Sequence, residues 1–147
     1  MNTEANLSDK KIQEWVQIPY KNKKKIERIK KTFQNNAPFP HIELPNFFND
    51  EKLKEILQAL TKEEFLEKES DLFKFMQTHD FATTTIPELR ELREFLASEI
   101  CTAYIEEITG IKIKPGSIDI SASLYQNSDY LLPHDDQLPG RKIAFML

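Results

Sequence analysis

The fold class is decided by the stretch IDISASLYQNSDYLLPHDDQLPGRKIAFML, residues 118–147. Between Ile118 and Leu124 apolar residues alternate with polar ones, which is the period of a strand with one buried face. Residues 141–147 are largely apolar and predict a further strand. Upstream of this stretch the apolar spacing is mostly helical. An order of helices first and strands later predicts an α+β protein.

Four upstream segments carry apolar residues at steps of three and four, which predicts helices. They are residues 9–17, a basic segment that follows Pro19, residues 53–60 with an Asn49 or Asp50 cap, and residues 87–104. Phe65 and Leu66 are candidates to extend the third helix, and Thr109-Gly110 ends the fourth. Short strands are expected at residues 41–44, 72–76 and 111–113.

Positive charge is concentrated near the N-terminus. Residues 1–33 hold nine Lys and Arg against four Asp and Glu, a balance of +5, so the remaining residues carry −9. The basic cluster is open to three interpretations: a nuclear address, an arm that faces RNA, or a solvated helix face above Ile26 and Ile29. The Pro38 and Pro40 break predicts a basic helical extension over residues 1–37 and a separate domain over residues 38–147.

Composition limits the class of protein. With 39% hydrophobic and 30% charged residues the chain is typical of a globular domain, and no apolar run is long enough to span a membrane. The acidic net charge of −4 argues against general nucleic-acid binding. A single cysteine, Cys101, excludes an internal disulfide and fits the nucleus or the cytoplasm.

The chemistry-bearing motif is His134-Asp135-Asp136. In extended chain, residues i and i+2 share a face, so His134 and Asp136 can converge while Asp135 points elsewhere. A neutral imidazole and a carboxylate are two parts of the facial triad that binds Fe(II) and leaves coordination positions open. Alone, this spacing is also typical of an ordinary polar loop, which the nearby Pro133 and Pro139 favour.

The surroundings of the motif narrow that choice. The stretch Leu131 to Leu147 resembles the metal-binding segment of the prolyl 3-hydroxylases that modify a small-subunit ribosomal protein, a family that includes the yeast translation-termination-associated enzyme and its animal relatives. Two upstream stretches agree in order and spacing: Leu44-Pro45-Asn46-Phe47-Phe48 and Asp71-Leu72-Phe73-Lys74-Phe75-Met76-Gln77. The resemblance covers residues 38–147.

This resemblance implies a jelly-roll (double-stranded β-helix) core that is truncated here, with helices packed on its first part. It also implies Fe(II) held by His134 and Asp136, 2-oxoglutarate hydrogen-bonded by Tyr125, and ascorbate support. The expected activity is prolyl hydroxylation of a ribosomal protein, linked to translation termination and accuracy. Translation-termination factors are further expected partners. The alternative for Tyr125 is an aromatic residue that closes the strand ending at Leu124.

The family's third iron ligand, a distal His, and the Arg that binds 2-oxoglutarate are expected beyond residue 147. His41 and His79 fall at structural or loop positions and do not replace that ligand. The chain alone is therefore expected to be inactive. The competing hypothesis is a truncated, non-catalytic adaptor whose helices, basic arm and half-built sheet bind protein partners.

Overall fold

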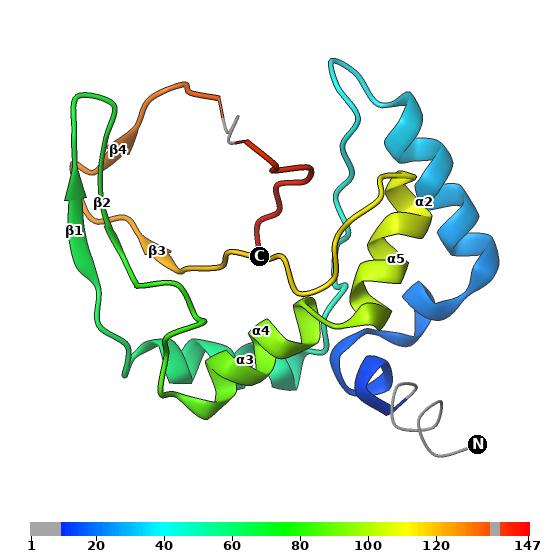
Figure 1. The fold of residues 1–147 in the computed structure, drawn as a ribbon, viewed down its shortest axis with the longest axis horizontal. Helices are drawn as coiled ribbons and strands as arrows, with labels where there is room; N and C mark the ends of the chain where they lie inside the picture. The colour runs from blue at the N-terminus through cyan, green and yellow to red at the C-terminus, as the bar shows by residue number, and fades with distance from the viewer. Residues whose placement is uncertain (1–9, 136–138) are drawn as a thin grey trace.

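The computed structural model describes residues 10–135 and 139–147. Helices and an antiparallel sheet occupy opposite sides of the molecule, joined below by α3 and α4, and residues 139–147 run between the two sides (Figure 1). This mixed arrangement agrees with the predicted α+β class. Residues 10–15 are helical, as expected for this segment, and they are followed by η1 (Ile18–Lys21), α2 (Lys23–Asn35), α3 (Asp50–Leu60), α4 (Pro87–Leu96) and α5 (Glu99–Thr109). The strands are β1 (Leu66–Glu69), β2 (Phe73–Gln77), β3 (Ser123–Leu124) and β4 (Tyr130–Leu131).

Local sequence signals explain some helix ends, whereas Asn49, at the expected start of α3, makes no side-chain cap hydrogen bond. The Asn22 side chain accepts hydrogen bonds from the amides of Lys24 and Lys25 and so caps α2. Gly110 ends α5 in the left-handed conformation, at φ 74°, as its position after Thr109 predicts. The expected single helix over residues 87–104 is wrong in one respect. It breaks before Ser98, whose side chain accepts from the Cys101 amide and starts α5 in a new direction.

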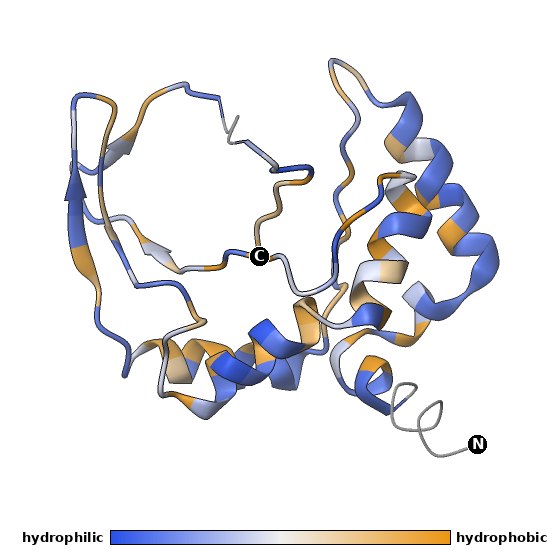
Figure 2. Ribbon diagram, in the orientation of Figure 1, coloured by the Kyte–Doolittle hydropathy of each residue, from blue (hydrophilic) through white to orange (hydrophobic). Residues whose placement is uncertain are grey.

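The core forms between the helices and includes residues from the N-terminal part of the chain. Trp15 is 1% exposed and stacks on Phe95 with ring centroids 5.2 Å apart. Asn49 joins the two segments as well, because its amide donates to the Trp15 carbonyl at 2.9 Å. The packed core of the described residues therefore has no break at residue 37, and the division into extension and domain stays a prediction about organisation. In Figure 2 the ribbons of α3 and α4 carry both orange apolar and blue polar bands, as expected for amphipathic helices.

The sheet is built on a tight hairpin. β1 and β2 pair with Leu66 opposite Gln77 and Glu69 opposite Lys74. Leu66 therefore begins strand β1. Its spacing predicted that it would extend α3, and this prediction is wrong because α3 already ends at Leu60. The Ser70 amide donates to the Phe73 carbonyl at 2.8 Å and closes the turn.

The other side of β2 pairs with both later strands. β3 pairs with the end of β2, where Leu124 lies opposite Met76. β4 pairs with the start of β2, where Leu131 lies opposite Phe73. Residues 120–132 therefore form one interrupted strand along the hairpin, with residues 126–129 bulging out between its two halves. Of the strand expected over Ile118–Leu124, the structure assigns only Ser123–Leu124, although the Phe81 amide donates to the Ile120 carbonyl at 2.9 Å.

Three segments that were predicted to be strands are not strands in the structure. Residues 41–44, 111–113 and 141–147 are extended or irregular and carry no strand assignment in the structure. Apolar alternation alone does not form a strand, because a strand also needs a partner for its backbone groups. The described residues form a single four-stranded sheet, so a jelly-roll core stays a prediction. Over the same residues, no helix is long and apolar enough to cross a membrane.

Candidate metal and co-substrate site

The segment that leads to His134 is tied to the tip of the β1–β2 hairpin. The Leu132 amide donates to the Leu72 carbonyl at 2.8 Å, and the Tyr130 hydroxyl donates to the Ser70 carbonyl at 3.1 Å. These bonds connect residues about 60 positions apart in the chain. They fix the direction in which the backbone leaves β4, and so they position the residues that follow it.

His134 is exposed, and a backbone contact orients its ring. Nδ1 lies 2.9 Å from the Leu132 carbonyl oxygen. A carbonyl can only accept, so Nδ1 carries the proton of the neutral imidazole and Nε2 carries the lone pair. Histidines that ligate metals in proteins are usually held in this way, with the other ring nitrogen donating to a carbonyl or carboxylate.

Tyr125 lies directly after β3 and packs against β2. Its ring centroid is 5.1 Å from that of Phe75, with 33° between the ring planes, and Phe75 in turn contacts Phe73 at 5.3 Å. The tyrosine is 47% exposed, and no hydrogen bond of its hydroxyl is found within the part of the chain that the structure describes. The ring therefore closes the strand, as one interpretation expected, and its hydroxyl remains available as a donor.

A compact turn separates Tyr125 from β4. The Gln126 amide donates to Oδ2 of Asp129 at 2.8 Å, and the Asp129 amide donates back to the Gln126 carbonyl at 3.1 Å. Ser128 adopts a positive φ of 73° to complete the turn. This turn forms the bulge in the interrupted strand. Tyr125 lies before the turn, directly after β3, and His134 lies beyond the turn, after β4.

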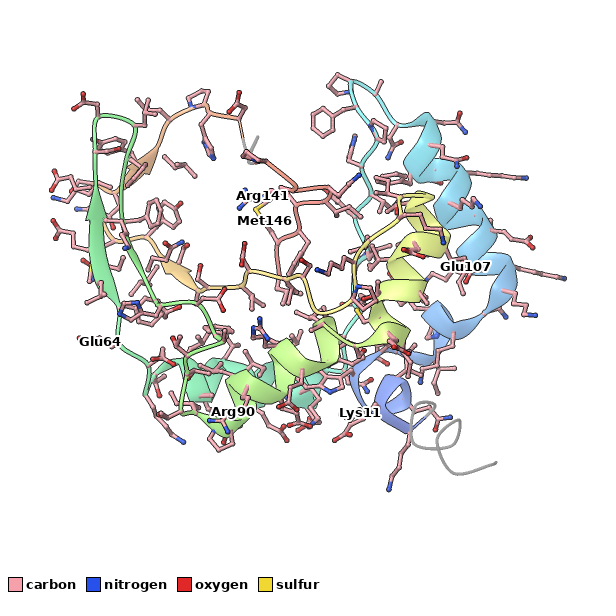
Figure 3. All side chains as sticks on the ribbon, in the orientation of Figure 1. Lys11, Glu64, Arg90, Glu107, Arg141 and Met146 are labelled. Carbon is pink, nitrogen blue, oxygen red and sulfur yellow. The ribbon has the colours of Figure 1, made fainter. Side chains whose placement is uncertain are left out.

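The remaining predicted ligand falls outside the structure. Asp136 lies outside the described residues, so its position relative to His134 is not given. Asp135 is exposed. Residues 10–135 and 139–147 contain no group of three or more His, Cys, Asp or Glu side chains that could hold a metal. Arg141 and Met146 lie on the segment that passes between the sheet and the helices in the view of Figure 3.

The other two histidines have structural surroundings. His41 is exposed and rests its Nδ1 against the Phe39 carbonyl at 2.8 Å. His79 is exposed in the loop after β2. Its neighbour Asp80 accepts from the Ile120 amide at 3.0 Å and pairs with Nε of Arg93 at 3.6 Å. Asp80 therefore fastens the interrupted strand to α4, a role that sequence reasoning missed because no local pattern marks it.

Comparison with known proteins places the chain in a family. No family model matches the sequence. It is 38% identical over 114 residues to the prolyl 3-hydroxylase OGFOD1 of Mus musculus. The aligned stretch covers 75% of this chain and 20% of the mouse protein. It is 34% identical over 125 residues to a prolyl 3,4-dihydroxylase of Ostreococcus tauri, covering 77% of this chain and 24% of the relative.

A prolyl 3-hydroxylase of Xenopus laevis is 32% identical over 114 residues, covering 77% of this chain and 22% of the relative. By these similarities the chain is related to the prolyl hydroxylases as a class. Within that class it belongs to the prolyl 3-hydroxylase family. The chain spans between a fifth and a quarter of the length of these three relatives.

Proposed function

We propose that the protein hydroxylates a prolyl residue of a small-subunit ribosomal protein, using Fe(II), 2-oxoglutarate and ascorbate. Support comes first from relatives named as prolyl hydroxylases at 31–38% identity. The observation that carries the proposal within the structure is the orientation of His134 by the Leu132 carbonyl. That contact sets the tautomer that a metal ligand needs.

The chemistry of the residues fits the metal. His134 and Asp136 would hold the iron as an imidazole and a carboxylate, the donor types of the facial triad. The Leu132 contact limits rotation of the imidazole and keeps the proton on Nδ1, which leaves Nε2 as the coordinating atom. When bound, the iron couples reduction of O₂ and decarboxylation of 2-oxoglutarate to oxygen insertion into a C–H bond of the substrate.

Tyr125 would hold the co-substrate. Its hydroxyl is a neutral donor that can bond to a carboxylate oxygen, and stacking on Phe75 limits rotation of the ring. A hydrogen bond to a charged acceptor is stronger than one between neutral groups, so one phenol makes a useful contribution to binding. Tyr125 thus combines a packing role with a binding role, and the two early interpretations of this residue do not conflict.

Charge supports the choice of substrate class. Residues 34–147 carry a balance of −9, which attracts a basic protein such as a ribosomal protein and steers its approach. A substrate of this kind would link the activity to translation termination and accuracy, with termination factors as further partners.

The test is an assay of the full-length protein with Fe(II), 2-oxoglutarate and ascorbate on proline-containing peptides from small-subunit ribosomal proteins. We expect one peptide to gain the mass of a single oxygen atom, with succinate formed in equal amount. Peptides in which the target proline is replaced by alanine provide the control. Succinate formed without any change in peptide mass, or no reaction with any ribosomal peptide, would reject the proposal.

A further inference from the structure

The exposed side of α2 carries a column of positive charge. Lys24, Arg28 and Lys31 are spaced at i, i+4 and i+7, which places them one above another on a helix. All three are exposed, whereas Ile26 and Ile29 on the opposite side are buried. The outer side of α2 is correspondingly hydrophilic in Figure 2.

These cations have no acidic partners within the described residues. Lysines and arginines elsewhere form seven ion pairs, such as Lys52 with Glu14 at 3.0 Å and Lys112 with Glu106 at 2.9 Å. None of those pairs involves a residue of α2, although Glu27 lies on the same helix. The column therefore keeps a net positive charge for an external anion, because Glu27 is the one acidic residue of α2.

The column is also held on a firm support. The Asn22 cap fixes the first turn of α2, and the buried Ile26 and Ile29 belong to the same core as Tyr104 of α5. Lys25 of the same helix does not belong to the column. Its Nζ lies 3.8 Å from the centre of the Tyr20 ring. A helical cluster fixed in this way presents regularly spaced charges, as the predicted basic helix requires.

We propose that the α2 column (Lys24, Arg28 and Lys31) binds the phosphate backbone of RNA. Neighbouring side chains of the column are about 5–6 Å apart at Cβ, a repeat of single charges that suits successive phosphates. The exposed side of α2 offers no large hydrophobic residue, which a membrane-binding helix needs to enter the lipid. The acidic balance of residues 34–147 repels the same backbone, which favours contact at α2 over contact elsewhere on the protein.

The experiment measures binding of the full chain to a short fluorescent uridylate RNA at increasing salt. Three phosphate contacts predict a slope of about −2 in log K against log salt for a single strand, and a loss of about 15- to 20-fold between 50 and 200 mM. The variant Lys24→Gln/Arg28→Gln/Lys31→Gln should bind about tenfold or more weakly at 50 mM, with a slope near zero. Glutamine keeps the helix propensity of lysine, so circular dichroism should be unchanged.

The matched control is Lys62→Gln/Lys68→Gln/Lys114→Gln, which removes the same charge from exposed lysines off α2. It should bind RNA like the unaltered chain. Equal weakening in both variants, or no RNA binding by the unaltered chain at 50 mM salt, would overturn the proposal. Binding to phosphatidylserine vesicles in place of RNA would overturn it as well.

Discussion

The Leu132 carbonyl oxygen lies 2.9 Å from Nδ1 of His134, while the Leu132 amide donates to Leu72 at 2.8 Å. The backbone of Leu132 thus connects the tip of the β1–β2 hairpin to the imidazole of His134. The Leu132 carbonyl orients the imidazole of His134 through Nδ1, and the hydrogen bond to Leu72 holds Leu132 in place. The proposed iron site therefore depends on the β1–β2 hairpin as well as on the ligands themselves.

The hydroxyl of Tyr125 should matter for 2-oxoglutarate and not for folding. Tyr125→Phe keeps the ring on Phe75 and removes only the donor. Loss of one hydrogen bond to a charged group costs about 1.5–3 kcal/mol, so the full-length protein should bind 2-oxoglutarate about 10- to 100-fold more weakly. Tyr20→Phe, which removes the hydrogen bond from the Tyr20 hydroxyl to the Pro45 carbonyl among the helices, serves as a control with normal co-substrate affinity. Equal affinities of the Tyr125 variant and the parent would remove Tyr125 from the site.

The N-terminal segment should contribute strongly to stability. Trp15 is 1% exposed and stacks on Phe95, so Trp15→Ala is expected to lower the free energy of unfolding by about 3–5 kcal/mol. Ile18→Ala is a useful comparison, because Ile18 is 79% exposed and its truncation should change stability by less than about 0.5 kcal/mol. Denaturant titration measures both values. A Trp15 variant as stable as the Ile18 variant would show that residues before 38 do not belong to the core.

Alkaline pH should destabilise the fold through Cys101. Burial raises the pKa of this thiol from 9.0 to about 11, because the thiolate is poorly solvated in the core. The folded chain then holds the proton more tightly than the unfolded chain, so this contribution is complete below pH 9 and is lost as pH rises through 11. The loss amounts to about 2–3 kcal/mol.

Burial also raises the pKa of Tyr104, which adds a loss in the same direction at still higher pH. Comparison with Cys101→Ala separates the two residues. The alanine variant should show a flatter decline in stability between pH 9 and 11, measured by urea unfolding at each pH. Parallel curves for the two proteins would mean that Cys101 is not buried as described.

Residues 1–147 on their own should release no succinate. The family resemblance assigns two iron ligands, His134 and Asp136, to these residues, and the facial triad needs a third protein ligand. The measurement is 2-oxoglutarate turnover with and without a ribosomal peptide. Turnover that depends on the peptide would show that a complete site forms within these residues.

Local signals in the sequence predicted the approximate position of most helices and of strand β2, but not strand β1, since Leu66 was expected to extend α3. The Asn22 and Gly110 ends follow from capping chemistry, and the alternation at residues 72–76 predicted β2 within one residue. The break at Ser98 was missed because Leu89 to Tyr104 continue the helical spacing across it. Serine is a favoured cap residue, so the signal was present but was outweighed by periodicity.

Contacts between residues far apart in the chain could not be predicted from the sequence. Residues 111–113 alternate as a strand does and residues 141–147 are largely apolar, yet the structure assigns no strand to either segment. The motif pointed to His134 through residue types and resemblance, but the Leu132 contact that orients its ring depends on backbone geometry. The same holds for Phe75, whose contact with Tyr125 requires the register of β2 and β3.

The central claim is that His134 and Asp136 hold iron while Asp135 does not. The most direct measurement is anaerobic Fe(II) binding by the full-length protein and its Asp136→Ala and Asp135→Ala variants, which carry the same loss of charge. We predict that Asp136→Ala weakens Fe(II) binding at least about 100-fold and that Asp135→Ala stays within about tenfold of the unaltered protein. Equal losses in the two variants, or normal iron binding by Asp136→Ala, would contradict the proposed site.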